Sequence, residues 1–135
     1  MYLIDTNVIS ELRKQANANV GVATFFRLHP DDLYLSVITI GELRAGVGKL
    51  QYRGDTKQAA LLAQWVSYVV IQFGDRVLEF NAACANEWAA MMAPNKQHPI
   101  DKQIAAIAKV HGLRVVTRNV RHFQGTGVPV ENPFS

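Results

Sequence analysis

Three carboxylic acids and one amide, spread over most of the chain, are the residues best suited to chemistry: Asp5, Glu42, Asp101 and Asn119. Asp5 and Asn119 follow short apolar runs rich in β-branched residues, whereas Glu42 and Asp101 lie near the starts of helical patterns. In parallel α/β folds, strand ends and the helix starts beside them meet at one edge of the sheet, where ligands bind. Clustered carboxylate oxygens are the ligands that Mg²⁺ and Mn²⁺ prefer. The pattern therefore predicts a divalent-cation site.

Each of these residues also has an ordinary structural explanation. Asp5 suits an N-cap between a strand and a helix, and Thr39 and Glu42 have the spacing of a capping box. Asp101, in a first helical turn, complements the helix dipole, and Asn119 is of a type common in turns. All four explanations place their residue beside a strand's carboxyl end, where three carboxylates would repel one another. A divalent cation removes that repulsion, so the joint interpretation favours a binding site.

Short apolar segments predict the strands that would position these residues. Strands are expected at 2–4, 33–36 and 113–117, with a shorter candidate at 76–80. The segment 125–133 predicts a turn and a final edge strand, because Pro129 is tolerated only at an edge.

Apolar residues at helical spacing predict the connections between these strands. Helices are expected at 6–14, 20–28, 39–50, 56–73, 81–92 and 99–111. Gly41, Gly46 and Gly48 are unfavourable inside the third helix, and close approach of another backbone would account for them. Strands that alternate with helices predict an α/β fold, with a parallel sheet flanked by helices in a single domain that spans 1–135.

Composition restricts the class of protein. The chain has 135 residues, 49% hydrophobic and 19% charged, which suits one folded domain with its own core. No apolar run approaches the roughly 20 residues that span a bilayer, and the N-terminus lacks a signal-peptide pattern. We therefore expect a cytoplasmic protein without a membrane segment. A net charge of +3 permits a polyanionic partner, and a single cysteine, Cys84, excludes an internal disulfide.

Motifs of other catalytic classes are missing. The sequence contains no P-loop, no nucleophile elbow and no dinucleotide-binding glycine motif. The four histidines, His29, His98, His111 and His122, are too dispersed along the chain to form a zinc motif.

The chain resembles the PIN-domain family, specifically toxins of the VapC/FitB type from bacterial type II toxin–antitoxin systems. The matching segments, in order, are LIDTNVIS, LSVITIGELRAGV, PIDKQIAAIAKVHGLRVVTRN and VENPF. The resemblance implies a PIN-like three-layer α/β/α sandwich with a mostly parallel central sheet, and a Mg²⁺- or Mn²⁺-dependent endoribonuclease. It also implies a homodimer, an RNA substrate and a cognate antitoxin whose tail fills the active-site groove.

The resemblance also implies roles for the four polar residues. Asp5 and Asp101 would hold the cation, and Glu42 would complete its ligand shell or orient the attacking water as a base. Asn119 falls on a position that is often Asp, and would position a water or a phosphate oxygen. Because Asn119 supplies a neutral oxygen, a second cation should bind more weakly, and one-metal and two-metal chemistry both stay open.

Two threonines and one arginine complete the expected site. Thr6 and Thr117 match family positions that hold the site together by hydroxyl hydrogen bonds. Arg118 is a candidate phosphate contact, and an exposed surface role is an equal alternative. Arg44 should point away from the site, because it lies about 200° around the helix from Glu42.

Two other functions compete with RNA hydrolysis. Asn119 favours a PIN-like module that has lost catalysis and only binds RNA or a protein. An aspartyl phosphotransferase of the haloacid-dehalogenase kind would use Asp5 as its nucleophile, but that chemistry expects a second Asp two residues later, where this chain has Asn7.

Overall fold

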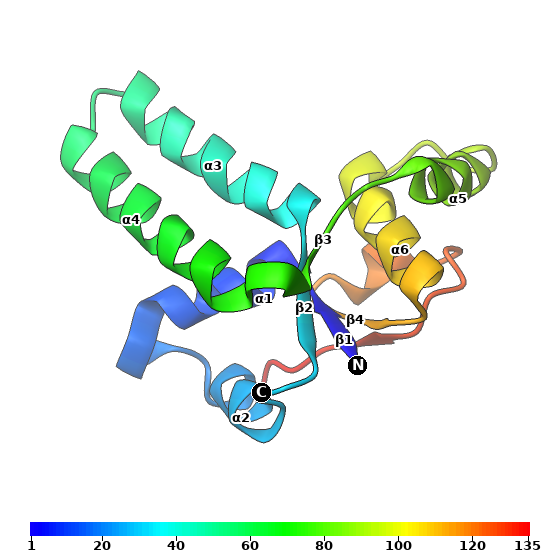
Figure 1. The fold of residues 1–135 in the computed structure, drawn as a ribbon, viewed down its shortest axis with the longest axis horizontal. Helices are drawn as coiled ribbons and strands as arrows, with labels where there is room; N and C mark the ends of the chain where they lie inside the picture. Colours follow the sequence, from blue (N-terminus) through cyan, green and yellow to red (C-terminus); the bar gives the residue numbers. More distant parts are fainter.

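The computed structural model describes residues 1–135 and has five parallel strands at its centre (Figure 1). In sequence they are β1 (Tyr2–Ile4), β2 (Leu33–Ser36), β3 (Val77–Leu78), β4 (Arg114–Val116) and β5 (Val130–Glu131). The order across the sheet is β3-β2-β1-β4-β5, and every pair is parallel. Because β1 lies in the middle, the residue that follows it, Asp5, emerges between the ends of its two neighbours.

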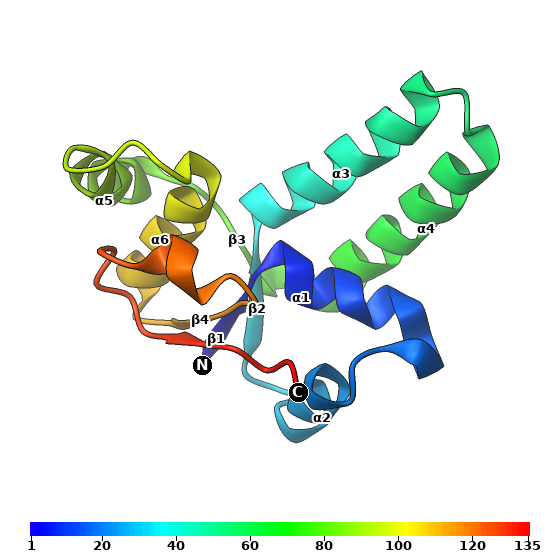
Figure 2. The same cartoon turned by 180° about the vertical axis from the view of Figure 1, so that it is seen from behind.

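Helices make the crossovers that parallel strands require. They are α1 (Thr6–Glu11), α2 (Val20–Leu28), α3 (Val37–Tyr52), α4 (Thr56–Phe73), α5 (Ala82–Met92) and α6 (Pro99–His111). Short 3-10 segments are η1 (Leu12–Asn17), η2 (Gly74–Arg76) and η3 (Val120–Phe123). Figures 1 and 2 show α3 and α4 as an antiparallel pair extending to one side of the sheet, with α5 and α6 on the other. Their length and hydrophobicity exclude a membrane crossing by any of these helices.

Alternating side chains of the central strands divide the core into two parts. Ile4 and Val116 belong to one cluster, which includes Val8, Phe25 and Val66 from α1, α2 and α4. Leu3 and Val115, the preceding residues of the same strands, belong to a second cluster, which holds Cys84, Met91 and Ile107 from α5 and α6. The expected three-layer α/β/α arrangement is therefore confirmed, with helices packed on both faces of the parallel sheet.

Several predicted segments coincide with the observed ones, namely 20–28, 33–36, 56–73 and 99–111. The predicted helix 6–14 is wrong at its end, because the α-helix stops at Glu11 and a 3-10 segment follows, in which Gln15 has a φ of 54°. The predicted 39–50 helix is too short, because Ser36 caps a helix that begins at Val37.

The expected close approach of a backbone to the glycines of α3 is wrong. A Cβ added at Gly41 or Gly48 would meet no atom within 4 Å, and one at Gly46 would meet only the Leu62 side chain at 3.5 Å. Nothing in the structure explains these three glycines.

Candidate active site

Asp5 lies at the carboxyl end of the central strand and caps the helix that follows. Its backbone N–H donates to the Val116 carbonyl at 2.9 Å, which continues the pairing between β1 and β4 by one residue. Its Oδ1 accepts a hydrogen bond from the Thr6 backbone N–H at 2.7 Å. With 2% of its surface exposed, Asp5 is a buried acid. Asp5 is therefore an N-cap at the carboxyl end of a strand, so the N-cap interpretation and the predicted cation-binding role of its position are compatible.

Thr117 and Asn7 tie the end of β4 to the end of β1. The Thr117 hydroxyl donates to Asp5 Oδ2 at 2.8 Å and accepts from the Asn119 backbone N–H at 3.0 Å. The Asn7 amide lies 3.4 Å from both Asp5 Oδ2 and the Thr117 hydroxyl, and its oxygen accepts from the Arg118 backbone N–H at 3.1 Å. These contacts fix the Asp5 carboxylate. Asn7 also places an amide where the rival phosphotransferase chemistry needs an acid.

Glu42 lies one turn into α3. Its carboxylate is hydrogen-bonded to Thr6 of α1 and not to the backbone at the start of its own helix. The predicted capping box is wrong, because the Ser36 hydroxyl caps α3 by accepting from the Thr39 backbone N–H at 3.1 Å. The Thr6 hydroxyl donates to Glu42 Oε1 at 2.6 Å and lies 3.0 Å from the Thr39 hydroxyl. Thr6 thus joins Asp5, through its backbone, to Glu42, through its side chain.

Asp101 lies in the first turn of α6, where its charge also complements the helix dipole. Its Oδ2 is 2.9 Å from His122 Nδ1. The His122 ring stacks on His98, with centroids 3.9 Å apart and an interplanar angle of 14°. The sequence analysis missed both histidines at this site because they are 24 residues apart and belong to no spaced motif.

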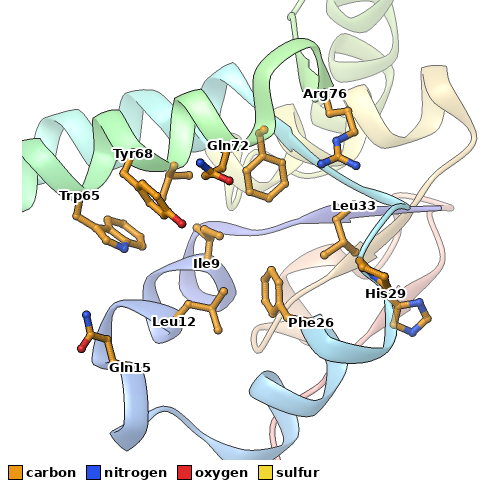
Figure 3. Close-up of a pocket in the computed structure, with 13 residues that line it drawn as sticks. Ile9, Leu12, Gln15, Phe26, His29, Leu33, Trp65, Tyr68, Gln72 and Arg76 are labelled. Carbon is orange, nitrogen blue, oxygen red and sulfur yellow. The ribbon is translucent and has the colours of Figure 1, made fainter.

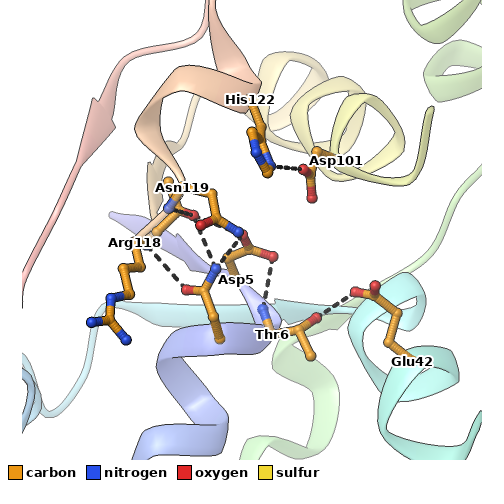
Figure 4. Close-up of polar contacts among 9 residues, drawn as sticks. Asp5, Thr6, Glu42, Asp101, Arg118, Asn119 and His122 are labelled. Atoms are coloured by element: carbon orange, nitrogen blue, oxygen red, sulfur yellow. Dashed lines mark hydrogen bonds and ion pairs between the residues drawn. The ribbon is translucent and has the colours of Figure 1, made fainter. Parts of the chain in front are cut away.

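The Asp5, Glu42 and Asp101 carboxylates face a common space from the ends of β1, α3 and α6 (Figure 4). The pKa of Asp5 is raised from 3.8 to about 6, chiefly by burial and to a smaller extent by the negative charges of Asp101 and Glu42. The hydrogen bonds from Thr117 and Thr6 oppose this rise. A divalent cation would stabilise the ionised form of all three acids, so this oxygen donor set fits Mg²⁺ or Mn²⁺. We call these three residues and the space between them the acidic pocket.

The arginines lie to the sides of the acidic pocket. Arg44 donates to the Ala63 carbonyl at 3.5 Å and to the Ser67 hydroxyl at 3.3 Å, both on α4, so its predicted orientation away from the site is confirmed. The Arg118 guanidinium lies over the Phe134 ring, 4.7 Å from its centroid, and points away from the carboxylates (Figure 4). A polar cleft of about 370 Å³ adjoins it, lined by Arg118, Asn119, Val120, Arg121, His122 and Asn132.

Comparison with known proteins identifies this arrangement. The sequence profile described as "PIN domain" matches residues 2–127. The chain belongs to the PIN-domain family. This PIN domain is 39% identical to "Toxin FitB" of Neisseria gonorrhoeae, with 99% of each chain covered. It is 32% identical to "VapC ribonuclease Y4jK" of Sinorhizobium fredii, with 99% of this chain and 98% of the relative covered. Among solved structures it is similar to that of FitAcB from Neisseria gonorrhoeae, with a TM-score of 0.85, 35% identity and 98% of each chain covered.

The PIN domain also has a large apolar groove, on the α1, α2 and α4 side of the sheet (Figure 3). Its volume is about 750 Å³, and eight of its 13 lining residues are hydrophobic. Ile9 and Leu12 form one wall, Phe26 and Leu33 a second, and Trp65 with its neighbours on α4 a third. We call this surface the apolar groove. The sequence analysis did not predict it, because its residues come from three separate stretches of the chain, 9–15, 26–33 and 65–76.

Proposed function

We propose that the single PIN domain formed by residues 1–135 is a Mg²⁺- or Mn²⁺-dependent endoribonuclease that acts as the toxin of a toxin–antitoxin pair. The observation that carries the proposal is the buried Asp5 carboxylate, which is held by Thr6 and Thr117 and faces two further acids. The relatives named as a toxin and as a ribonuclease support the same activity.

In this proposal, Asp5 and Asp101 hold the cation and Glu42 either completes its ligand shell or accepts the proton of the attacking water. When bound, the cation would activate water and offset the negative charge that develops on the phosphate. The Thr6 hydroxyl orients Glu42 and the Thr117 hydroxyl orients Asp5, so neither carboxylate has to reorganise during the reaction. Asn119, whose backbone is fixed by Thr117, presents a neutral amide to water or to a phosphate oxygen.

RNA preference would arise outside the acidic pocket. Because water is the nucleophile, the ribose 2′-hydroxyl takes no part in the chemistry, so RNA would be selected by shape and by contacts along the strand. The cleft beside Asn119 contributes Arg118 and Arg121, whose charges suit phosphate groups. We propose this cleft as the path of the substrate backbone, with Arg118 turned from Phe134 toward a phosphate when RNA binds.

The partner we propose is an antitoxin protein. Similar solved structures include the FitAB complex bound to a DNA fragment, with a TM-score of 0.85 and 33% identity. The apolar groove offers such a partner a concave, largely hydrophobic surface of a kind that takes an amphipathic helix. We also propose a cytoplasmic location and a homodimer, the latter because Leu61 and Ile71, outside the apolar groove, leave exposed apolar surface on α4.

The activity is tested with purified protein freed of its antitoxin and stripped of metal by chelation. We expect RNA cleavage to return on addition of Mg²⁺ or Mn²⁺, and to be abolished in Asp5→Asn and in Asp101→Asn. Asp75→Asn, a substitution at an exposed acid in η2, is the matched control and should keep full activity. Cleavage that persists in both pocket variants would exclude the proposed chemistry.

The second candidate function is a module that binds RNA or protein without cleaving. Asn119 favours it, because a neutral amide adds no negative charge to the cation site that the three acids form. Calorimetric titration with Mg²⁺ separates the two functions. Heat of binding at millimolar Mg²⁺ that is lost in Asp5→Asn supports the nuclease, and no binding in that range supports the module.

A further inference from the structure

At one side of the acidic pocket, two imidazoles and a carboxylate converge in a way that RNA hydrolysis does not use. One ligand atom each from His98, Asp101 and His122 lie within 4.8 Å of one another. No other group of three His, Cys, Asp or Glu residues meets this spacing. The three acids of the acidic pocket do not meet it either. The cluster is open to solvent, since the His122 side chain is 36% exposed and that of Asp101 19%.

The fold holds all three residues on fixed backbone. His98 is the N-cap residue of α6 and makes no side-chain cap hydrogen bond. Its ring stacks on that of His122 at an interplanar angle of 14°, so one imidazole has to turn about its side-chain torsions for both to point a nitrogen at one cation. Next to His98, the Pro99 carbonyl accepts from the Trp88 indole N–H at 3.0 Å, and the buried Lys102 amino group donates to the Asn95 carbonyl. These bonds anchor the first residue of α6 to α5, and the loop before α6 to α6 itself.

His122 is anchored independently, from the segment that follows β4. Its backbone N–H donates to the Asn119 carbonyl at 3.0 Å, and the next residue, Phe123, is buried in the core. The imidazole is therefore brought to Asp101 by the same turn that carries Asn119 to the acidic pocket. His98 and His122 meet because two separate anchored loops end at the same place.

The donor set discriminates between classes of metal ion. Mg²⁺ and Ca²⁺ prefer oxygen ligands, whereas imidazole nitrogens favour Zn²⁺, Co²⁺ and Ni²⁺. Two imidazoles and one carboxylate are a known ligand set for such ions, with positions left for water. The acidic pocket, made of oxygen ligands alone, has the opposite preference.

We propose that His98, Asp101 and His122 form a binding site for one transition-metal cation of the Zn²⁺ class, separate from the acidic pocket but sharing Asp101 with it. Because one carboxylate serves both sites, a cation bound at the histidine site reduces the affinity of the acidic pocket for Mg²⁺, and the reverse holds by linkage. Zn²⁺ would then inhibit RNA cleavage. This second consequence rests on the proposed nuclease function, whereas Zn²⁺ binding itself does not.

The binding experiment is a calorimetric titration of the metal-free protein with Zn²⁺, repeated with Co²⁺ and followed by its visible absorption. We expect one equivalent to bind to the wild-type protein, and binding at least tenfold weaker in His98→Asn. Asn is chosen because it tolerates the left-handed backbone of His98, whose φ is 55°. His111→Asn, at the exposed end of α6, is the matched control and should bind as the wild type does.

Equal Zn²⁺ affinity in the wild type and in His98→Asn would overturn the proposal, as would equal loss in His111→Asn. Thermal unfolding without metal establishes that each variant is folded. If His98→Asn does not fold, His122→Gln tests the same site from the other loop, with the same expected loss.

Two further arms distinguish this site from the nuclease proposal. Asp5→Asn should lose RNA cleavage and still bind one Zn²⁺, because Asp5 is not a ligand of the histidine site. In Mg²⁺, added Zn²⁺ should inhibit the wild type more than His98→Asn, each measured against its own activity without Zn²⁺. Zn²⁺ binding that depends on His98 in a protein that cleaves no RNA would sustain the site and reject the nuclease. If the protein cleaves RNA but binds Zn²⁺ equally well with and without His98, the nuclease proposal stands and the histidine site is rejected.

Discussion

The acidic pocket and the apolar groove both depend on the segment after β1, but they are organised in opposite ways. At the start of α1, Asp5 accepts a hydrogen bond from Thr117, directly after β4, and Thr6 donates one to Glu42 of α3. Ile9 and Leu12, less than two turns later, line a groove of about 750 Å³ whose walls are mainly apolar. In the pocket each polar group has a specific partner, whereas in the groove shape and apolar area are what matter.

This difference predicts how each region responds to substitution. Hydrogen bonds in the acidic pocket are directional, so removing a single oxygen should change the chemistry while the fold remains. The groove has no such partners, so its binding energy should be spread over its aromatic and aliphatic side chains, with a few dominant positions. The two surfaces should therefore be separable by mutation.

The largest expected effect is that of Asp5→Asn on RNA cleavage. We expect a loss of about 1,000-fold or more, because the variant removes a charged ligand from the centre of the pocket. At pH 7 and without metal, the same variant should unfold at no lower temperature than the wild type, since it removes a buried charge. Single-turnover cleavage and a metal-free thermal scan measure both. A variant that loses activity only because it unfolds would remove the contrast between the two regions.

The pH dependence of stability should carry the signature of the buried acid. The folded-state pKa of Asp5, raised from 3.8 to about 6, means that folding favours its protonated form. Its contribution is thus fully present below pH 3.8 and is lost as pH rises through about 6, amounting to about 3 kcal/mol.

Urea unfolding of the metal-free protein between pH 3.5 and 7 measures this loss, with Asp5→Asn as the reference. The reference cancels other acids, among them Glu11, whose pKa is lowered by its hydrogen bonds to Lys14 and to the Asn19 backbone and whose effect therefore has the opposite sign. A difference between the two proteins that does not change with pH would show that Asp5 titrates normally.

A charge in the groove should affect partner binding and not catalysis. Tyr68→Asp places a carboxylate on the α4 wall, at a side chain that is 58% exposed, and should weaken antitoxin binding by about 10- to 100-fold. The control is Tyr52→Asp, at a 95% exposed residue outside the groove. Titration of each toxin variant with antitoxin, alongside its RNA cleavage rate, reports both properties. Full inhibition of Tyr68→Asp at wild-type antitoxin concentrations would show that the partner binds elsewhere.

The smallest effect we predict concerns the hydroxyl that holds Asp5. Thr117→Val keeps the side-chain shape but removes the donor to Asp5 and the acceptor for the Asn119 N–H, which should destabilise the fold by about 1–3 kcal/mol. Because the Thr117 bond lowers the pKa of Asp5, its loss should also move the pH-dependent change in stability to higher pH. The same urea series measures the loss of stability and its pH dependence. If the pH at which stability changes is the same as in the wild type, Thr117 has a purely structural role.

The sequence was most informative where backbone rules act locally. Asp5 and Asn119 were placed because residues that follow parallel strands meet at one edge, and the strands before them were predicted within one residue at each end. Glu42 was found for a partly wrong reason: the pattern suggested a capping box with Thr39, but Ser36, three residues earlier, caps the helix. Ser36 and Thr39 are both suited to cap this helix. Which of them does so depends on where the preceding strand ends, and the sequence does not determine that.

The remaining features depend on contacts between distant segments. His98 and His122 meet on Asp101 because two loops are anchored side by side, and neither loop has a recognisable pattern. The apolar groove is likewise formed by stretches that the sequence analysis assigned to separate helices, a loop and a strand. Which carboxylates take part in catalysis remains a prediction, to be decided by the substitutions above.

The bonds that assemble the acidic pocket join residues far apart in the chain: Thr117 with Asp5 across 112 positions, and Asn7 with Arg118 across 111. A ribosome making this protein must therefore finish β4 and the residue after it before Asp5 acquires its Thr117 donor. Until then the nascent polypeptide contains Asp5, Glu42 and Asp101 but not the hydrogen bonds that assemble the acidic pocket. For a protein proposed to attack cellular RNA, this order of assembly delays its harmful activity until β4 and the turn after it have been synthesised.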